Sequence, residues 1–226
     1  MPAPAEIATP ALDGQLVYTY AVLHPLYGEI GTFTDTIDRK PETMQIEGRL
    51  RIAVKFLGIV VYRHESDIST TMRDERLISL QSVTRKDGES LEVRGEAQGD
   101  QFVVNATGGS FAGPATILPS DPFVLKSTGE ESMIFTDTGE IINVQVSGGD
   151  RSTVSVNGNP VSARRFVVDG ITRWEVWVDN GGIPVKFRIV EKGTPIDFVL
   201  QNTTASPGTT VAAMERPVRV GLENGE

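Results

Sequence analysis

Apolar and polar side chains alternate along most of this chain with a period of two, and one segment breaks the alternation. From residue 46 to residue 55 every second position is apolar or glycine, and the positions between them are mostly charged. Residues 56–62, Phe-Leu-Gly-Ile-Val-Val-Tyr, are then apolar at both parities. Strict alternation is typical of a strand with one buried face, whereas a strand that is apolar at both parities has both faces covered. We therefore expect protein, ligand or lipid on both faces of this run.

The same period of two predicts strands through the rest of the chain. Short turns separate them, and several of these turns contain an Asp-Gly, Asn-Gly or Lys-Gly pair, which favours a tight antiparallel hairpin. Strands are expected at residues 14–23, 29–38, 43–55, 76–85, 91–94, 102–104, 140–146, 153–156, 161–168, 173–178, 185–190 and 196–200. This spacing is typical of a sandwich, barrel or half-barrel. The predicted fold is all-β with minor α: a long antiparallel meander that forms a curved sheet, half-barrel or open barrel.

One β domain is expected over residues 14–202. It contains two meanders, residues 14–107 and 132–202, joined by a crossover that is rich in glycine and proline. Residues 1–13 are expected to be a disordered leader, and residues 203–226 a flexible tail.

The crossover is predicted to be mostly irregular. Residues 108–114 hold three glycines and a proline, which favours a loop over a regular element. Further on, Ser120 or Asp121 precedes Pro122, so this segment can cap one short helix over residues 123–126.

Composition and charge exclude several classes of protein. The chain has 226 residues, of which 39% are hydrophobic and 23% charged, as is ordinary for a globular protein. A formal charge of −9 argues against binding nucleic acid through net charge. The longest apolar run, residues 56–62, is far shorter than the roughly 18–20 residues that a membrane-spanning helix needs. We expect no nucleic-acid partner and no transmembrane segment.

The compartment is predicted from cysteine usage and from the first residues. Cysteine is absent, which excludes disulfides, zinc-thiolate sites and thiol catalysis. This absence suits a cytosolic protein and is also tolerated in an oxidising periplasm. Residues 1–5, Met-Pro-Ala-Pro-Ala, contain no basic and apolar targeting segment. They resemble instead the small residues that follow a cleaved signal peptide. The chain is therefore expected to be an exported, periplasmic protein.

Candidate catalytic groups are few. His24 precedes a proline in a turn and His64 lies in a charged stretch, so both are expected at the surface. The glycine-rich segment 108–113 lacks the Gly-x-Ser-x-Gly spacing of a nucleophile loop. The carboxylates near residues 74–75, 130–131 and 137–140 lack calcium-loop spacing and are expected to form a solvated rim. We therefore predict no enzyme, no catalytic residue, no metal site and no cofactor.

Aromatic residues are more informative. Trp174 shares its parity with two valines, whereas Trp177 has the opposite parity, between Glu175 and Asp179. One tryptophan is therefore expected in the core, and Trp177 on the other face at a rim or interface. Phe187 and Phe198 belong to one-sided apolar stripes on the last two strands, which form core in most proteins and a cavity wall in a curved open sheet.

Several motifs together resemble a known family. They are the stretch from Arg76-Leu77 to Lys86-Asp87-Gly88, the turn Thr138-Gly139-Glu140, the segment 157–166 and the segment 174–186, Trp-Glu-Val-Trp-Val-Asp-Asn-Gly-Gly-Ile-Pro-Val-Lys. The chain resembles, over about residues 15–200, a family of exported bacterial β-rich proteins with a domain of unknown function. That family is similar in shape to the periplasmic lipoprotein carriers of the Lol system. The resemblance implies a curved antiparallel sheet around an apolar cavity and no catalytic residues.

The chain departs from the family pattern at two places. The pattern has a tryptophan and a glycine where residues 72–77 contain Met72 and Glu75, and an aromatic pair where Phe123 stands alone. No family-wide role is carried over to these positions.

Two functional hypotheses follow. The first is a non-catalytic periplasmic binding or carrier protein for a lipid or other apolar molecule, with residues 108–114 as part of a lid. Its predicted ligand-binding residues are Phe56, Leu57, Ile59, Val60, Tyr62, Phe123, Phe187 and Phe198. The second is a structural or interaction module of the cell envelope, whose core is filled by its own side chains and which docks a partner protein through Trp177 or an edge strand. If the sheet does not curl, the run 56–62 becomes the expected contact with a protein or a membrane.

Overall fold

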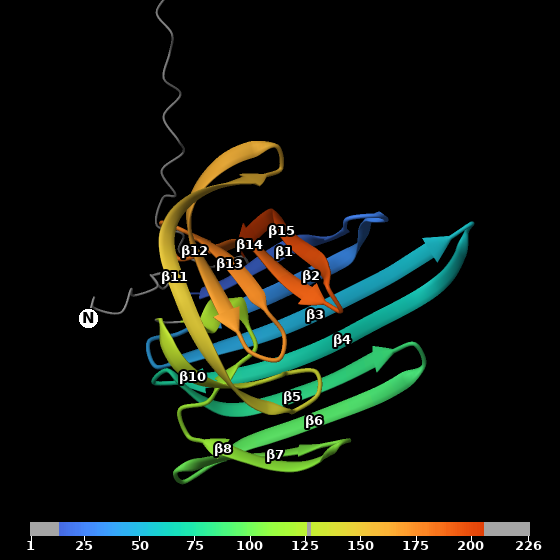
Figure 1. Cartoon of the computed structure of the whole chain (residues 1–226). Coiled ribbons are helices and arrows are strands. Elements are labelled where there is room, and N and C mark those ends of the chain that lie inside the picture. Colours follow the sequence, from blue (N-terminus) through green and yellow to red (C-terminus); the bar gives the residue numbers. More distant parts are fainter. Residues whose placement is uncertain (1–13, 126–127, 206–226) are drawn as a thin grey trace, which may run out of the picture.

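The fold is a single curved sheet. The computed structural model describes residues 14–125 and 128–205, and these form fifteen strands in one sheet that is not closed (Figure 1). The order across the sheet is β8-β7-β6-β5-β4-β3-β2-β1-β15-β14-β13-β12-β11-β10-β9, and every pair is antiparallel except β10 with β9. The predicted all-β half-barrel is confirmed. The predicted leader 1–13 lies outside the described residues, as does the part of the predicted tail from residue 206 onward. The first residues of that predicted tail, 203–205, are instead the end of strand β15 and pair with β1.

The strand bounds agree with most of the predicted alternation. The strands are β1 (Gly14–His24), β2 (Gly28–Arg39), β3 (Thr43–Phe56), β4 (Ile59–Arg73), β5 (Arg76–Lys86), β6 (Glu89–Gln98), β7 (Gln101–Ala106), β8 (Gly109–Pro114), β9 (Leu118–Pro119), β10 (Gly129–Ile134), β11 (Ile141–Val156), β12 (Asn159–Asp169), β13 (Trp174–Asp179), β14 (Pro184–Glu191) and β15 (Thr194–Ala205). One 3₁₀ turn, η1 (Pro122–Val124), lies between β9 and β10, where a short helix was predicted. Asp121 caps it: its carboxylate accepts a hydrogen bond of 2.8 Å from the amide of Phe123.

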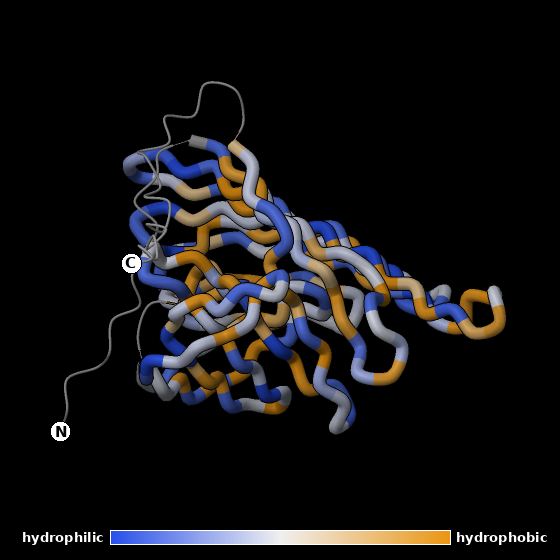
Figure 2. The backbone as a smooth tube through the Cα atoms, turned by 90° about the horizontal axis from the view of Figure 1, so that it is seen from above, coloured by the Kyte–Doolittle hydropathy of each residue, from blue (hydrophilic) through white to orange (hydrophobic). Residues whose placement is uncertain are grey.

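We predicted that both faces of the run 56–62 are covered. In the structure this chain leaves the run exposed, because it is the tip of a hairpin. Leu57 and Gly58 form the two-residue turn between β3 and β4, and both have positive φ, +50° and +82°. The apolar side chains on either side of this turn are exposed. Figure 2 shows this apolar tip projecting beyond the body of the protein. The sequence pattern of a strand covered on both faces therefore marks an exposed apolar hairpin tip here.

Two glycine-rich segments that read as turns or loops are strands. Residues 108–114, predicted to be a loop, contain β8, which pairs with β7. Gly113 in β8 is buried, and a Cβ there would lie 2.9 Å from Ile117, so glycine permits close packing at this edge. Residues 149–150, predicted to be a turn, lie inside β11, where the register with β12 shifts between Gly148 and Asp150. A β-bulge increases the local bend of a strand, and β11 arches strongly over the second meander (Figure 1).

The two ends of the sheet approach each other across its concave side. Ile117 and Ile134, near β9 and β10, are fully buried in a cluster with Leu80, Val93 and Phe102 of β5, β6 and β7. The hydroxyl of Ser82 in β5 donates a hydrogen bond to the carbonyl oxygen of Thr136. The sheet thus covers its own concave face, since the described residues include no α-helix that could cover it. Among those residues, moreover, no helix has the length and apolarity needed to cross a membrane.

The turn after β10 fits tightly against the first meander. Gly139 has a φ of +78°, and a Cβ there would lie 2.8 Å from the Cβ of Ala106 and 3.2 Å from Val93 and Val104. Gly193, in the β14–β15 turn, has nearly the same φ, +81°, but no heavy atom within 4 Å of such a Cβ. Alanine substitutions at the two glycines would therefore cause similar backbone strain but differ in the packing of the added methyl group.

We expect Gly139→Ala to destabilise the protein more than Gly193→Ala. The Gly193 variant meets only the strain of positive φ, about 1 kcal/mol, whereas the Gly139 variant also overpacks the closing contact, for a total of about 2–4 kcal/mol. Urea unfolding measures both free energies. Equal losses would contradict the packing of this turn against β6 and β7.

Candidate functional site

A cavity of about 350 Å³ remains where the two halves of the curved sheet face each other without touching. This volume is within the range of about 300–1,000 Å³ that is common for small-molecule sites. Its wall is mainly apolar and comes from both meanders: Phe33, Leu50, Phe135, Trp174, Phe187 and Phe198. Polar side chains line much of the rest, among them Asp35, His64, Ser66, Lys86, Asp121 and Glu191. The arrangement suits a molecule with a large apolar part and a small polar group.

Three phenylalanines form the centre of the apolar wall. The rings of Phe187 and Phe198, opposite each other on β14 and β15, stack with centroids 4.3 Å apart and planes 12° apart. The ring of Phe33 on β2 meets both edge-on, at 5.8 and 5.9 Å. Because β2 is separated from β15 by β1, this cluster depends on the curvature of the sheet. Such aromatic pairs contribute about 0.5–1.5 kcal/mol beyond the area they bury.

Asp35 is the most unusual residue of the site. It lies on β2, two positions after Phe33 on the same face, and its side chain is fully buried. Neither carboxylate oxygen has a hydrogen-bond partner among the described residues. Burial raises the pKa of this carboxyl well above its ordinary value, and the nearby Asp121 raises it further. A buried polar group without a partner costs about 1–3 kcal/mol, so Asp35 is held at a cost to stability.

Gly48 makes the space that Asp35 occupies. The two residues are opposite each other in the β2–β3 ladder, and a Cβ on Gly48 would lie 3.1 Å from one oxygen of Asp35. Gly48 itself lines the cavity. A glycine at an otherwise apolar position of β3 thus opens room for a carboxyl group that the fold does not pair.

Asp121 brings a second carboxyl to the same cavity. Its position is set by the cap of η1, where one oxygen accepts the amide hydrogen of Phe123. Burial raises the pKa of Asp121 to about 6, and that hydrogen bond opposes the rise. Both carboxyls therefore take up protons at a higher pH than exposed aspartates.

His64 is not the surface histidine that we predicted. It lies on β4, its side chain is partly buried and lines the cavity, and its Nε2 atom has no partner among the described residues. Burial lowers the pKa of this imidazole, and the neighbouring Lys86 lowers it further. His64 is therefore neutral at neutral pH. The charged residues around it in sequence alternate with inward-facing ones, and that alternation is why the local composition was misleading.

Polar contacts bridge the two meanders beside the cavity. At one end Lys86 of β5 forms an ion pair of 2.9 Å with Glu191 of β14, and its ammonium lies 5.9 Å from the ring centre of Tyr62. Within the first meander, the hydroxyl of Ser66 on β4, a residue that lines the cavity, lies 2.8 Å from the hydroxyl of Thr84 on β5. These groups have partners within the protein, in contrast to Asp35.

The predicted ligand-binding residues fall into three groups. Phe187 and Phe198 line the cavity. Tyr62 is partly buried next to the main core, and Phe123 is buried against Tyr18, with ring centroids 4.7 Å apart; the cavity lining includes neither. The hairpin-tip residues are exposed and also outside the lining: Phe56, Leu57, Ile59 and Val60.

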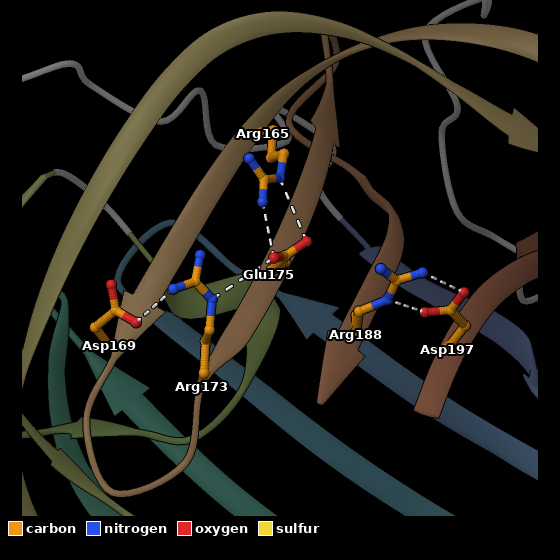
Figure 3. Close-up of polar contacts among 6 residues, drawn as sticks. All are labelled: Arg165, Asp169, Arg173, Glu175, Arg188 and Asp197. Atoms are coloured by element: carbon orange, nitrogen blue, oxygen red, sulfur yellow. Dashed lines mark hydrogen bonds and ion pairs between the residues drawn. The ribbon is translucent and has the colours of Figure 1, made fainter. Parts of the chain in front are cut away.

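Trp177 lies on the convex face, opposite to Trp174, as its parity predicted. It is only 8% exposed, because it packs in a hydrophobic cluster with Val154, Ala163 and Val185 and cationic side chains lie near its ring. Lys186, Arg165 and Arg188 lie 5.2, 5.8 and 6.0 Å from the ring centre. The arginines are held by carboxylates on neighbouring strands, Arg165 by Glu175 at 2.7 Å and Arg188 by Asp197 at 2.5 and 2.9 Å (Figure 3). Trp177 is therefore part of a covered ionic patch on this face.

No metal centre emerges from the part of the chain that the structure describes, in which no three histidine or acidic side chains gather in a way that could hold a metal ion. The chemistry that the cavity offers is hydrogen bonding and ion pairing by Asp35 and Asp121 beside an aromatic wall. Sequence reasoning missed both aspartates. For Asp35 a signal exists: it stands between Phe33 and Ile37 in the apolar parity of its strand.

We expect Asp35→Asn to stabilise the protein in a pH-dependent way. The raised pKa means that folding favours the protonated carboxyl, so the stability of the wild type falls as pH rises from the unfolded pKa, about 4, through the folded pKa. The gain from the variant is thus near zero at pH 4 and on the order of 2 kcal/mol once the carboxyl ionises. Thermal unfolding from pH 4 to pH 9 measures it. Asp38→Asn, on the outer face of the same strand, is the control and should shift stability by less than about 0.5 kcal/mol. Loss of stability in Asp35→Asn at every pH would contradict an unpartnered carboxyl.

Comparison with known proteins identifies a family and a fold. One similar solved structure is a β-barrel-like protein of the domain of unknown function DUF1849 from Brucella abortus. The match covers 87% of this chain and 100% of that one, with a TM-score of 0.61 and 10% sequence identity. At this identity the likeness concerns the fold alone. No curated protein matches. Residues 28–201 match the model of the domain of unknown function DUF6134, and the chain therefore belongs to the DUF6134 family.

Proposed function

We propose that this protein is a non-catalytic binding or carrier protein for a lipid or another apolar molecule. The observation that carries the proposal is the cavity of about 350 Å³ with an aromatic and aliphatic wall. Protein interiors are normally close-packed, so a cavity of this size between the two meanders is a feature that the fold maintains. A structural module with a self-filled core, the alternative that the sequence left open, gives no reason for such a cavity.

The surroundings of the cavity support the same proposal. The strand registers bring the β1–β2, β3–β4, β12–β13 and β14–β15 turns to one end of the sheet. Exposed apolar residues gather in these turns: Leu26, Tyr27, the hairpin tip and Ile171. Ile171 also lines the cavity. An apolar ligand would thus meet apolar side chains at the same end of the molecule.

The compartment is proposed to be the periplasm. A chain without cysteine is compatible with this oxidising compartment. Fractionation of cells that express the full-length gene product is the direct test.

Filling the cavity should abolish ligand binding. Ile189 and Val190 are neighbours on β14, but only Ile189 lines the cavity. We expect the wild type to bind the apolar dye N-phenyl-1-naphthylamine with a rise in dye fluorescence. Ile189→Trp should weaken this binding at least about tenfold, or about 1.4 kcal/mol, while Val190→Trp leaves it unchanged. No dye binding by the wild type, or equal loss in both variants, would refute the cavity as the site.

A second candidate function, docking to a membrane surface, is favoured by the conformation of the hairpin tip. Among the described residues, five two-residue turns between strands have both φ values positive, and their first residues are Leu57, Asp74, Asp87, Asn157 and Lys192. Asparagine and aspartate adopt this conformation most readily, and leucine does so rarely. Leu57 is moreover 87% exposed. The tip therefore holds a leucine where an asparagine would be more stable and more soluble, as expected of a contact residue.

We expect Leu57→Asn to raise the free energy of unfolding by about 0.5–1 kcal/mol and to weaken binding to phosphatidylcholine–phosphatidylethanolamine vesicles in a flotation assay. Lys192→Asn, a change in a turn of the same type, should not reduce flotation. Wild-type protein that fails to float would exclude membrane docking, and concentration-dependent dimerisation that Leu57→Asn abolishes would assign the tip to a second copy of the chain.

A further inference from the structure

The cavity carries a marked excess of acidic groups. Among the described residues, its lining contains five carboxyl side chains and two basic ones; the carboxyls are Asp35, Asp121, Asp137, Glu140 and Glu191, and the basic groups are Lys86 and His64. Lys86 already forms an ion pair with Glu191, and the lowered pKa of His64 keeps its imidazole neutral at neutral pH. An anionic headgroup would therefore meet repulsion in this cavity, and a cationic one attraction.

We propose that the cavity selects an amphipathic molecule with a protonated primary amine, whose ammonium group binds the carboxylate of Asp35 and whose hydrocarbon part lies along the aromatic wall. The inference rests on the proposed function, since it names the class of ligand for the same cavity.

Asp35 has the properties expected of a ligand-binding carboxyl group. It is 0% exposed, it lines the cavity, and both of its oxygens lack a hydrogen-bond partner among the described residues. A buried carboxyl in a purely structural role is normally hydrogen-bonded. An ammonium group supplies three N–H donors, enough to satisfy both oxygens of Asp35 and to reach the nearby Asp121.

The aromatic wall next to Asp35 favours the same ligand. Phe33 precedes Asp35 by two residues on the same strand and face, and its ring contacts those of Phe187 and Phe198. Ring faces attract cations, by about 0.5–2 kcal/mol depending on desolvation. A carboxylate beside a cluster of phenylalanines thus binds an ammonium group by an ion pair on one side and aromatic rings on another, and it offers little to a neutral or anionic headgroup.

The carboxyl pKa values give the proposal a pH signature. Burial and the neighbouring Asp121 raise the pKa of Asp35 well above its ordinary value, and the pKa of Asp121 is about 6. The other titratable groups of the cavity and of the adjacent strand β1 are His64, Lys86, Glu191, Asp137, Glu140, Tyr18 and Tyr20. An alkylamine, like lysine with its pKa of about 10.4, stays protonated below pH 9. Binding therefore releases a proton from the carboxyls, and amine affinity should rise from pH 5 to pH 8.

The test compares three probes of equal chain length by isothermal titration calorimetry: dodecylamine, dodecanol and dodecanoate, each below its micellar concentration. The wild type should bind dodecylamine with 1:1 stoichiometry, more tightly than dodecanol, and dodecanoate most weakly. Asp35→Asn should weaken dodecylamine binding at least about tenfold and leave dodecanol binding unchanged. Asp38→Asn, which removes the same charge from the outer face, should change neither affinity.

The possible failures are distinguishable. If the wild type binds dodecanol but Asp35→Asn binds dodecylamine as tightly as the wild type does, the amine inference is wrong and the proposed apolar site stands. If the wild type binds none of the three probes, the proposed function itself fails. An amine affinity that falls as pH rises from 5 to 8 would also overturn the inference, because it would mean that the ligand prefers the protonated carboxyl.

Discussion

The curvature of one continuous sheet is the constraint on which the rest of this structure depends. An antiparallel sheet with an apolar face must bury that face, and in the described residues no α-helix is available to do so. The sheet therefore bends until its two halves face each other. Where they touch, around Ile117, Ile134 and Phe102, they form a close-packed core. Where they do not touch, the same apolar face becomes the wall of a cavity, so cavity and core have one cause.

The polar groups of the cavity follow from the same geometry. A strand that faces a packed core tolerates few carboxyls, but a strand that faces a cavity can hold one. Asp35 is such a residue: Gly48 leaves room for it, and the fold provides no partner. The hydroxyls and the Lys86–Glu191 ion pair nearby are satisfied within the protein. That contrast separates the polar groups that have partners within the protein from the carboxyl that we assign to ligand binding.

Much of the fold could be predicted from alternation and turn chemistry, and the exceptions have physical reasons. Hairpins at Asp87-Gly88, Asn157-Gly158 and Lys192-Gly193 were clear because these pairs suit turns with positive φ. Strand β8 was missed because glycine carries no side chain that shows a parity, and the bend in β11 because its glycines permit a bulge as readily as a turn. The hairpin tip was misplaced because Leu57-Gly58 does not resemble a turn. In the site, the apolar stripes that contain Phe187 and Phe198 were predicted. The proximity of Asp35 and Asp121 could not be predicted, because it arises from the curvature of the sheet, which local sequence patterns do not encode.

Native mass spectrometry of protein purified without detergent shows directly whether the cavity holds an apolar ligand. We expect a species heavier than the chain by the mass of one small amphipathic molecule, which is released on unfolding and identified in the organic extract. Protein that has only its own mass, from every expression host and compartment, and that stays at that mass after incubation with apolar amines and alcohols, would refute a carrier function for this cavity.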